Sequence, residues 1–340
     1  MADTLLDYAA AVYDLSASQL TPMSGGYTTR VYQFARDGQE YVLRIIPPDV
    51  DIDLRSTLAK LAWLEFLGSH RGPVSRPVRS PQGNLIESVA YTGQTYLVEV
   101  FEKAAGVLAE NMTPEDWNEA LFVALGDTVG RCHAIARDYV PENEELRLPQ
   151  WDQAVNCFNP MQELVGAEGF ILEQRAKVVE AIQALPKDRQ DYGLAHLDLH
   201  FANFYVDTAS QQITFFDFDD CAYGWYIMDI AMLIFDVLVV YNGLDRQQFG
   251  ARFLESLLRG YLPQKPMRIF WMQQLPHFVK LLEISIYAEL YRDYDPATAG
   301  EWVNKFMLGR EQCIRQGVPY VSLDFDGIYR KATLGEYESN

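Results

Sequence analysis

Residues 196–203 read His-Leu-Asp-Leu-His-Phe-Ala-Asn, with an aspartate between two histidines and an asparagine five residues after it. Two apolar runs follow over 204–206 and 213–218, separated by a polar run over 207–212, and this pattern predicts a β-hairpin. If the turn centres on residues 209 and 210, antiparallel pairing puts residue 203 opposite about residue 216. Asn203 and Asp217 then lie side by side at the open end of the hairpin, and Asp198 lies in the loop leading into it.

These three side chains supply the oxygen atoms that phosphoryl transfer needs. Mg²⁺ takes a few protein oxygen ligands and keeps water and phosphate oxygens for the rest, which suits Asn203 and Asp217. Asp198 carries a carboxylate that can orient a hydroxyl and accept its proton as the hydroxyl attacks a phosphoryl group. Protein kinases use Asp-x-x-x-x-Asn followed by a strand-ending Asp for this chemistry.

The two histidines allow another interpretation. His-x-Asp is two-thirds of the facial triad of a metal-dependent oxygenase, which needs a second, distant histidine and a β-barrel. The later histidine, His277, falls in a helical pattern, so the oxygenase is the weaker alternative. We expect His196 to hold the loop by packing and hydrogen bonds, whereas the residues alone assign His200 neither to structure nor to the site.

Composition excludes several classes of protein. The 340 residues carry a formal charge of −19, which argues against a nucleic-acid partner and could attract a cationic small molecule. The most apolar run, 227–241, contains two aspartates and is too short to span a bilayer, so we expect no membrane partner. Four scattered cysteines suit a reduced cytoplasmic protein in which each is a small buried side chain. Nothing indicates the oligomeric state.

The order of elements predicts an α+β protein with two lobes. Strands over 27–35 and 40–46, a helix over 54–67, and strands near 84–91 and 94–101 form a β-rich region. A helix is expected from Thr113 to about residue 137, followed by helices at about 161–184, 226–242, 246–260, 268–292 and 299–316. We therefore expect an N-terminal lobe over 1–102 and a helical C-terminal lobe, interrupted by the one hairpin, over 103–340.

Two features of the N-terminal region suit a nucleotide. Ser24, Gly25 and Gly26 precede the first strand, and glycine lets backbone N–H groups approach phosphates closely. Arg44 stands alone in the apolar run Tyr-Val-Leu-Arg-Ile over 41–45, where its charge needs a partner, and a phosphate would serve.

Together these residues resemble the aminoglycoside phosphotransferase and choline kinase-like family, whose members share the protein-kinase fold. The family's catalytic segment reads roughly His-Gly-Asp-[Leu/Ile]-His-x-x-Asn, followed by a hairpin and [Ile/Phe]-Asp-[Phe/Trp]-[Asp/Glu]. Residues 196–203 and 216–219 match it, and the phrase over 306–310 resembles a bacterial branch of the family. The resemblance covers most of the chain and implies a two-lobed fold with a nucleotide-binding N-lobe.

The resemblance also implies roles for particular residues. Asp198 would be the catalytic base, Asn203 and Asp217 would bind Mg²⁺, and Asp229 would brace the catalytic loop. ATP, or alternatively GTP, would be held by the glycine segment, by Arg44 in place of the usual lysine, and by the backbone of the lobe-connecting segment. From that segment we single out Glu99 and Phe101.

The acceptor would be a hydroxyl of a small molecule, as in aminoglycosides, choline or homoserine. The substrate candidates combine acidic and aromatic side chains, which suit a cationic amine: Asp219, Asp220, Trp225, Glu283 and Tyr287. Two departures favour an alternative, a weak or inactive nucleotide- or metabolite-binding relative. Lys60 stands where the family has a glutamate, so we expect it to repel Arg44, and Leu197 replaces the glycine of the catalytic segment.

Overall fold

A computed structural model describes residues 4–23, 29–48, 54–113, 115–241 and 245–334. The chain divides into two compact units, each considered by itself. The first unit comprises residues 1–105, 139–148 and 214–219, and the second comprises 106–138, 149–213 and 220–340. The first unit thus includes two short segments from the later part of the chain, and one of them contains Asp217 and Asp219.

An antiparallel sheet forms the centre of the first unit. Its strands, in the order β1-β2-β3-β5-β4, are β1 (Thr21–Pro22), β2 (Arg30–Arg36), β3 (Gln39–Ile46), β5 (Gln94–Glu102) and β4 (Glu87–Tyr91). Asp37 and Gly38 both have positive φ in the turn between β2 and β3, as a tight hairpin requires. The predicted strand-strand-helix-strand-strand order is therefore present, preceded by a short helix and β1.

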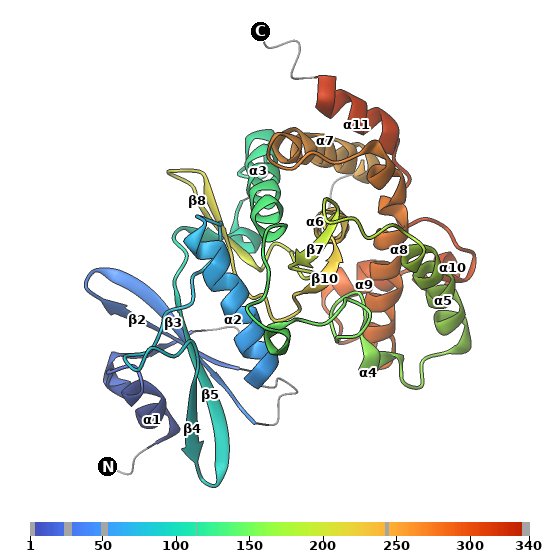
Figure 1. Cartoon of the computed structure of the whole chain (residues 1–340). Helices are drawn as coiled ribbons and strands as arrows, with labels where there is room; N and C mark the ends of the chain where they lie inside the picture. Colours follow the sequence, from blue (N-terminus) through green and yellow to red (C-terminus); the bar gives the residue numbers. More distant parts are fainter. Residues whose placement is uncertain (1–3, 24–28, 49–53, 114, 242–244, 335–340) are drawn as a thin grey trace. The chain divides into compact units, whose positions relative to one another are not determined.

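Helices α1 (Leu5–Ala11) and α2 (Leu54–Ser69) belong to the same unit as this sheet (Figure 1). Ala9 and Ala10 of α1 are buried in the same core cluster as Leu43, Val98 and Val100 of the central strands. In α2, the buried residues include Leu61, Leu64 and Leu67, and Lys60 is also buried among them. A buried lysine needs a carboxylate partner, which makes its surroundings informative.

The second unit is mostly helical. Its helices are α3 (Glu119–Ala136), α4 (Met161–Leu164), α5 (Gly169–Gln183), α6 (Ile227–Val240), α7 (Arg246–Gln264), α8 (Ile269–Tyr291), α9 (Glu301–Met307), α10 (Arg310–Arg315) and α11 (Phe325–Leu334). None of the helices in the described ranges is long and apolar enough to cross a membrane.

Three predicted helices differ from the observed ones. The helix expected from Thr113 begins at Glu119, because the Asn118 side chain caps it by accepting a hydrogen bond from the Leu121 N–H group. The helix expected over 161–184 is divided into α4 and α5. The helix expected over 299–316 is divided into α9 and α10 at Gly309, whose φ of 68° lies outside the helical region.

Short strands of the second unit position the loop around Asp198. β7 (Tyr192–Ala195) ends directly before His196, and it pairs antiparallel with β10 (Ala222–Trp225). Because Ala195 is opposite Ala222, the loop after β7 starts beside the residues that precede β10. β6 (Val107–Leu108), β8 (Phe204–Asp207) and β9 (Gln212–Phe215) form another sheet, and the chain passes from the second unit to the first within β9.

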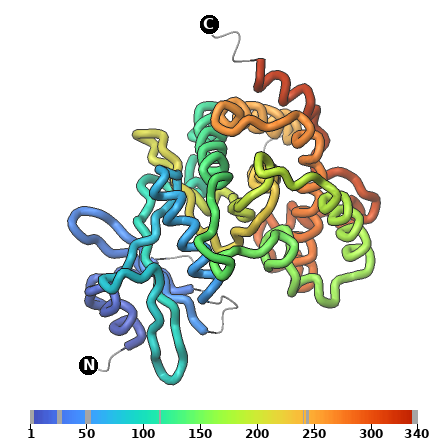
Figure 2. The backbone as a smooth tube through the Cα atoms, viewed as in Figure 1, coloured from blue at the N-terminus to red at the C-terminus, as the bar shows by residue number. Residues whose placement is uncertain are grey.

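Helices α3 and α7 lie side by side at very short range (Figure 2). A Cβ atom on Gly126 of α3 would overlap the carbonyl oxygen of Leu257, and one on Gly260 of α7 would overlap that of Val123. Glycine at both positions lets the two backbones approach. This approach brings Tyr261 of α7 to His133 of α3, with Tyr261 Oη 3.1 Å from His133 Nδ1.

Candidate active site

Four charged side chains form an ion cluster in the first unit. Arg44 lies on β3, Glu99 on β5, Lys60 on α2 and Asp219 beyond β9. Arg44 Nη1 is 3.1 Å from Glu99 Oε1, and Arg44 Nη2 is 2.5 Å from Asp219 Oδ2. Lys60 Nζ is 3.2 Å from Glu99 Oε2 and 2.7 Å from Asp219 Oδ1. Each cation therefore contacts both carboxylates, and the formal charges cancel.

Strand register explains half of this cluster. Arg44 and Glu99 are directly opposite each other in the β3–β5 pair, where side chains on one face meet. Burial disfavours the charged forms of Arg44 and Lys60, but the neighbouring carboxylates, Asp219 foremost, raise the pKa of both side chains. Arg44 does lower the pKa of Lys60, as repulsion between the two cations requires, but Asp219 and Glu99 lie between them and outweigh this effect.

Asp217 presents its carboxylate beside this cluster. Its φ is 59°, in the left-handed region that non-glycine residues rarely adopt, and its side chain is 46% exposed. The neighbouring Phe218 is buried and packs edge-on against Trp63, with ring centroids 5.5 Å apart. Anchoring Phe218 while Asp217 turns outward leaves the Asp217 carboxylate accessible, 3.7 Å from Arg44 Nη1.

A chain of buried polar groups holds the loop of the second unit. Asp229 on α6 accepts hydrogen bonds from the backbone N–H groups of His196 at 3.1 Å and Leu197 at 2.8 Å. Its Oδ2 is also 2.9 Å from His133 Nε2, and His133 contacts Tyr261 in turn. Burial would raise the pKa of Asp229, but His133 and the loop backbone lower it, so an ionised Asp229 accepts these bonds.

Leu197 occupies a backbone conformation that suits glycine. Its φ is 63° and its side chain is fully buried. A left-handed conformation costs a branched residue stability unless its surroundings impose it. Here the Asp229 carboxylate accepts from the N–H groups of two successive residues, His196 and Leu197. The leucine therefore adopts a left-handed conformation that glycine would reach more easily, and these two bonds help to hold it there.

Among the described residues, Asp198 is contacted by a thiol, an amide and an imidazole rather than by lysine or arginine. Cys157 Sγ donates to its Oδ1 at 3.0 Å, and Asn203 Nδ2 donates to its Oδ2 at 2.9 Å. His200 Nε2 is 3.4 Å from Oδ2. Burial would raise the pKa of Asp198, but His200 and then the Cys157 thiol lower it below its ordinary value. The carboxylate is therefore ionised and ordered.

Asn203 and His200 complete this loop. The Asn203 amide nitrogen donates to the Asp198 backbone carbonyl at 2.8 Å and lies 3.1 Å from His200 Nε2. His200 Nδ1 accepts a hydrogen bond from the Ala202 N–H group at 3.2 Å. Thus His200 contacts both Asp198 and Asn203, a role that the sequence left open. Asn203 belongs to the second unit and Asp217 to the first, so their joint binding of a metal ion stays a prediction.

Comparison with known proteins identifies the family. A model of the phosphotransferase enzyme family APH matches residues 19–271, which is most of the chain. The chain belongs to this family. The predicted relationship, the α+β class with a protein-kinase-like fold, and the prediction of a small-molecule kinase are therefore confirmed.

Individual relatives cover nearly the whole chain. An amicoumacin kinase of Bacillus subtilis (strain 168) is 29% identical over 332 residues, which are 96% of each protein. A solved amicoumacin kinase in complex with AMP-PNP, Ca²⁺ and Ami is similar with a TM-score of 0.84 at 27% identity, covering 95% of this chain and 96% of that one. A microcompartment-associated aminopropanol kinase, with a TM-score of 0.65 at 20% identity over 90% of this chain and 93% of that one, shows the fold alone.

The remaining predicted site residues of this APH-family chain differ in accessibility. Asp220 is half-buried and accepts a hydrogen bond from the Cys157 N–H group at 2.9 Å. Trp225 is fully buried and donates from Nε1 to the Pro186 carbonyl at 2.8 Å. Glu283 is fully buried between Lys280 and Arg310. Ser24, Gly25 and Gly26 lie outside the described residues.

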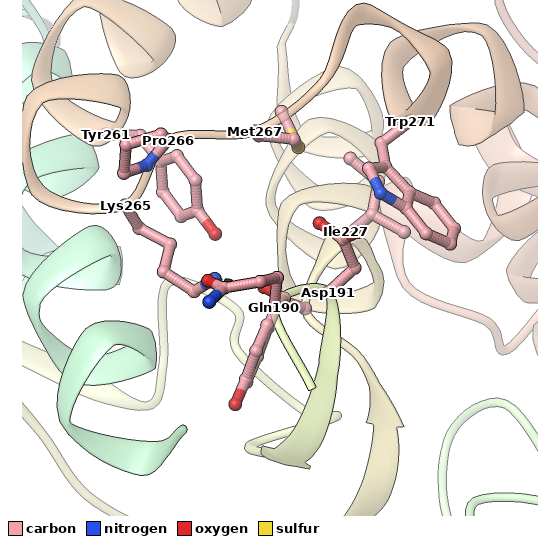
Figure 3. Close-up of a pocket in the computed structure, with 9 residues that line it drawn as sticks. Gln190, Asp191, Ile227, Tyr261, Lys265, Pro266, Met267 and Trp271 are labelled. Atoms are coloured by element: carbon pink, nitrogen blue, oxygen red, sulfur yellow. Dashed lines mark hydrogen bonds between the residues drawn. The ribbon is translucent and has the colours of Figure 1, made fainter. Parts of the chain in front are cut away.

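Two cavities of the second unit border residues already described, Tyr261 and Arg310. The one in Figure 3 has a volume of about 10 Å³, room for about one water molecule. Lys265 lines it, and its ammonium group donates to the carbonyl oxygen of Gln190 (Figure 3). A larger cavity of about 680 Å³ is lined by Tyr287, Tyr291 and the start of α10. Tyr287 thus borders a cavity, as a substrate residue would, although its side chain is buried.

Sequence reasoning missed two residues with informative contacts. Lys60 was expected to disturb the nucleotide site, and its carboxylate partners could not be seen because they lie on other elements. Cys157 was expected to be a small buried side chain, yet it is half-buried and its thiol contacts Asp198, 41 residues further along the chain. No local pattern marks either contact.

Proposed function

We propose that this chain transfers the γ-phosphoryl group of ATP to a hydroxyl of a small molecule, with Asp198 as the general base. The arrangement of Asp198 carries the proposal. Its carboxylate is ionised and held by donors to both oxygens, in a loop whose backbone Asp229 braces. A carboxylate so placed can orient an acceptor hydroxyl and accept its proton during attack.

Asn203 and Asp217 fit a hard divalent cation by their chemistry. The amide nitrogen of Asn203 is engaged by Asp198, which leaves its Oδ1 atom as the ligand. Asp217 offers an exposed carboxylate. Oxygen ligands of this kind suit Mg²⁺, and the Ca²⁺ in the related amicoumacin kinase structure agrees with a divalent ion. When bound, the ion would neutralise charge on the phosphate oxygens.

The nucleotide would be held by the first unit. We propose that Arg44 orients the phosphates together with the segment Ser24–Gly26, and that the backbone of Glu99 and Phe101 lies near the base. Two observations support Arg44: its guanidinium is fixed by Glu99 and Asp219, and it lies close to Asp217. The AMP-PNP bound to the related kinase supports ATP as the phosphoryl donor. GTP is the alternative donor.

An acceptor that carries an amine is the substrate class we propose. The relatives named amicoumacin kinase and aminopropanol kinase act on small molecules, and carboxylates gather near Asp198. Carboxylate oxygens of Asp198 and Asp220 lie within 4.8 Å of each other, and burial, followed by the like charges of Glu163 and Asp198, raises the pKa of Glu289 on α8. A bound ammonium group would relieve their repulsion.

Of the predicted substrate residues, Asp220 has the strongest support, because it meets Cys157 next to Asp198. Asp219 already binds Arg44 and Lys60, and Trp225 and Glu283 are fully buried with their polar atoms engaged. We therefore do not propose substrate contacts for these three. Tyr287 remains a candidate through the larger cavity.

We do not favour the two alternatives, an inactive relative and a metal-dependent oxygenase. The inactive-relative hypothesis depended on repulsion between Arg44 and Lys60 and on the loss of a glycine at position 197, and the structure accommodates both changes. The oxygenase hypothesis needs two histidines with a carboxylate. In the described part of the chain, the group of possible metal ligands at this loop is instead Cys157, Asp198 and Asp220.

Two measurements test the proposal. ATP with Mg²⁺ should raise the melting temperature more than ATP with a chelator does. The same measurement with GTP and Mg²⁺ shows which of the two nucleotides stabilises the protein more. A screen of amines, amino alcohols and sugars, with ATP consumption as the readout, should then reveal the acceptor. Asp198→Ala should lower that turnover by about 10²- to 10⁴-fold while the nucleotide-dependent shift persists. Equal turnover by Asp198→Ala would contradict the role of Asp198.

A further inference from the structure

A tight turn before α4 holds Cys157 in one position. The Asn156 side chain donates to the carbonyl of Trp151 at 2.7 Å and to that of Ala154 at 3.1 Å. Its Oδ1 atom accepts a hydrogen bond from the Phe158 N–H group at 2.9 Å. Because the side chain of Asn156 bridges the residues on both sides of Cys157, the backbone of Cys157 has little freedom.

Two helices hold the same turn from outside. Arg175 of α5 donates to Asn159 Oδ1 at 2.6 Å. Ser285 of α8 donates to the Phe158 carbonyl at 3.3 Å. Phe158 itself is fully buried. The position of Cys157 is therefore determined by the packing of the helical unit and not by the catalytic loop that it contacts.

From this fixed position, Cys157 contacts two carboxylates with two different groups. Its thiol donates to Asp198 Oδ1 at 3.0 Å, and its backbone N–H donates to Asp220 Oδ2 at 2.9 Å. Burial, followed by the charge of Asp198, raises the pKa of the thiol well above its ordinary value. The thiol therefore keeps its proton and acts as a hydrogen-bond donor.

We propose that Cys157 is a positioning residue, whose thiol fixes the orientation of the Asp198 carboxylate toward the acceptor hydroxyl. This inference rests on the proposed function of Asp198. Asn203 and His200 contact Oδ2, whereas among the described residues Cys157 is the donor to Oδ1. Each carboxylate oxygen can accept two hydrogen bonds, so Oδ1 retains one position for the acceptor hydroxyl.

The thiol acts by restricting rotation of the carboxylate. With donors on Oδ2 alone, the plane of the carboxylate can turn about the Cβ–Cγ bond. A donor on Oδ1 stops that rotation and keeps the free position of Oδ1 in one direction. Since transfer requires the base and hydroxyl to be aligned, a misplaced carboxylate lowers the rate without weakening the binding of ATP.

Side-chain substitutions can isolate this effect, because the contact to Asp220 uses the backbone of Cys157. Cys157→Ala removes the thiol donor, and Cys157→Ser restores a hydroxyl donor of similar size. Neither change removes the N–H group that Asp220 accepts. Cys313→Ala is the matched control, since Cys313 is also half-buried and lies in α10 of the same unit.

The experiment measures kcat and KM for ATP and for the acceptor found by the screen. Cys157→Ala should lower kcat by about fivefold to tenfold, with KM for ATP unchanged within about twofold. Cys157→Ser should recover most of the lost kcat. Cys313→Ala should match the wild-type protein. Equal kcat in Cys157→Ala and wild type overturns the inference, and so does an equal loss in Cys157→Ala and Cys157→Ser.

Failure of the proposed function gives a different result. In that case the wild-type protein turns over no acceptor, or Asp198→Ala is fully active. A double-mutant cycle on the free energy of unfolding, with Cys157→Ala and Asp198→Asn, then still tests the contact. Additive effects of the two changes would show that the thiol does not hold the carboxylate, and the inference would be overturned.

Discussion

The ion cluster of the first unit and the catalytic loop of the second unit both hold carboxylates, but with different partners. Glu99 and Asp219 each contact two full positive charges. Asp198 instead meets an amide, a thiol and an imidazole. A carboxylate between two cations is a poor base, whereas one held by weaker donors can still accept a proton. The contrast separates the carboxylates that stabilise structure from the one placed for chemistry.

The two units also differ in how they hold their charged side chains in place. In the first unit, strand register and one helix bring charges together, so the cluster depends on electrostatic balance. In the second unit, packing of the helices brings Tyr261 against His133, and His133 against Asp229. The position of the loop therefore depends on how closely these helices pack. We therefore expect charge changes to damage the first unit most and volume changes to damage the second.

The largest expected effect comes from removing one charge of the buried cluster. Glu99→Gln removes the fully buried carboxylate and leaves the two cations with Asp219 and, for Arg44, the more distant Asp217. Breaking a buried pair in this way costs about 3–5 kcal/mol. Chemical denaturation with a probe in the first unit measures the loss. Glu65→Gln, in the exposed pair with Arg79, is the control and should cost at most about 1 kcal/mol. Similar losses in both variants would contradict the importance assigned to the cluster.

A smaller effect is expected from adding one methyl group between α3 and α7. Gly260→Ala places a Cβ against the Val123 carbonyl, and such overpacking costs about 1–3 kcal/mol. Because this overlap forces the two helices apart, Tyr261 and His133 move with them, and turnover should also fall. In Gly250→Ala, on the same helix, the new Cβ lies 3.0 Å from a flexible Leu238 methyl group, so stability should stay within about 1 kcal/mol of wild type. Equal behaviour of the two variants would show that close helix approach does not support the loop.

The smallest effect is a dependence of stability on pH in the second unit. Burial lowers the pKa of His133 below its ordinary value, and Asp229 only partly opposes this. The unfolded chain therefore binds a proton near pH 6.5 while the folded one does not, so stability falls as pH drops below about 6.5. The expected slope is up to about 1.4 kcal/mol per pH unit. Denaturation midpoints at pH 8 and pH 5 measure it.

His133→Gln removes this titrating group, so its pH dependence between 8 and 5 should be flatter than that of wild type. Asp229 adds a second, separate contribution, because its pKa is depressed in the folded chain. The stability that this gives is fully present above about pH 4 and is lost as the pH falls further and the carboxylate protonates. An unchanged slope in His133→Gln would assign the pH dependence to another group.

Local patterns predicted most elements but not their ends. The strands predicted over 27–35 and 40–46 are separated by Asp37 and Gly38, and both residues have the positive φ that such a turn requires. The start of α3 was placed too early, since both Thr113 and Asn118 can cap a helix and packing selects between them. The break at Gly309 was missed because a single glycine inside an apolar periodic segment is compatible with a continuous helix.

For the site, the sequence by itself determined which side chains carry oxygen and in what order: Asp198, Asn203, Asp217 and Asp229 follow a spacing that is read without any structure. Only the tertiary structure decided which charges meet. Glu99 joins Arg44 through strand register, Lys60 joins them from a helix, and Cys157 reaches Asp198 from a turn held by α5 and α8. Such contacts join residues far apart in the chain, and their geometry follows from how whole elements pack, which no local spacing encodes.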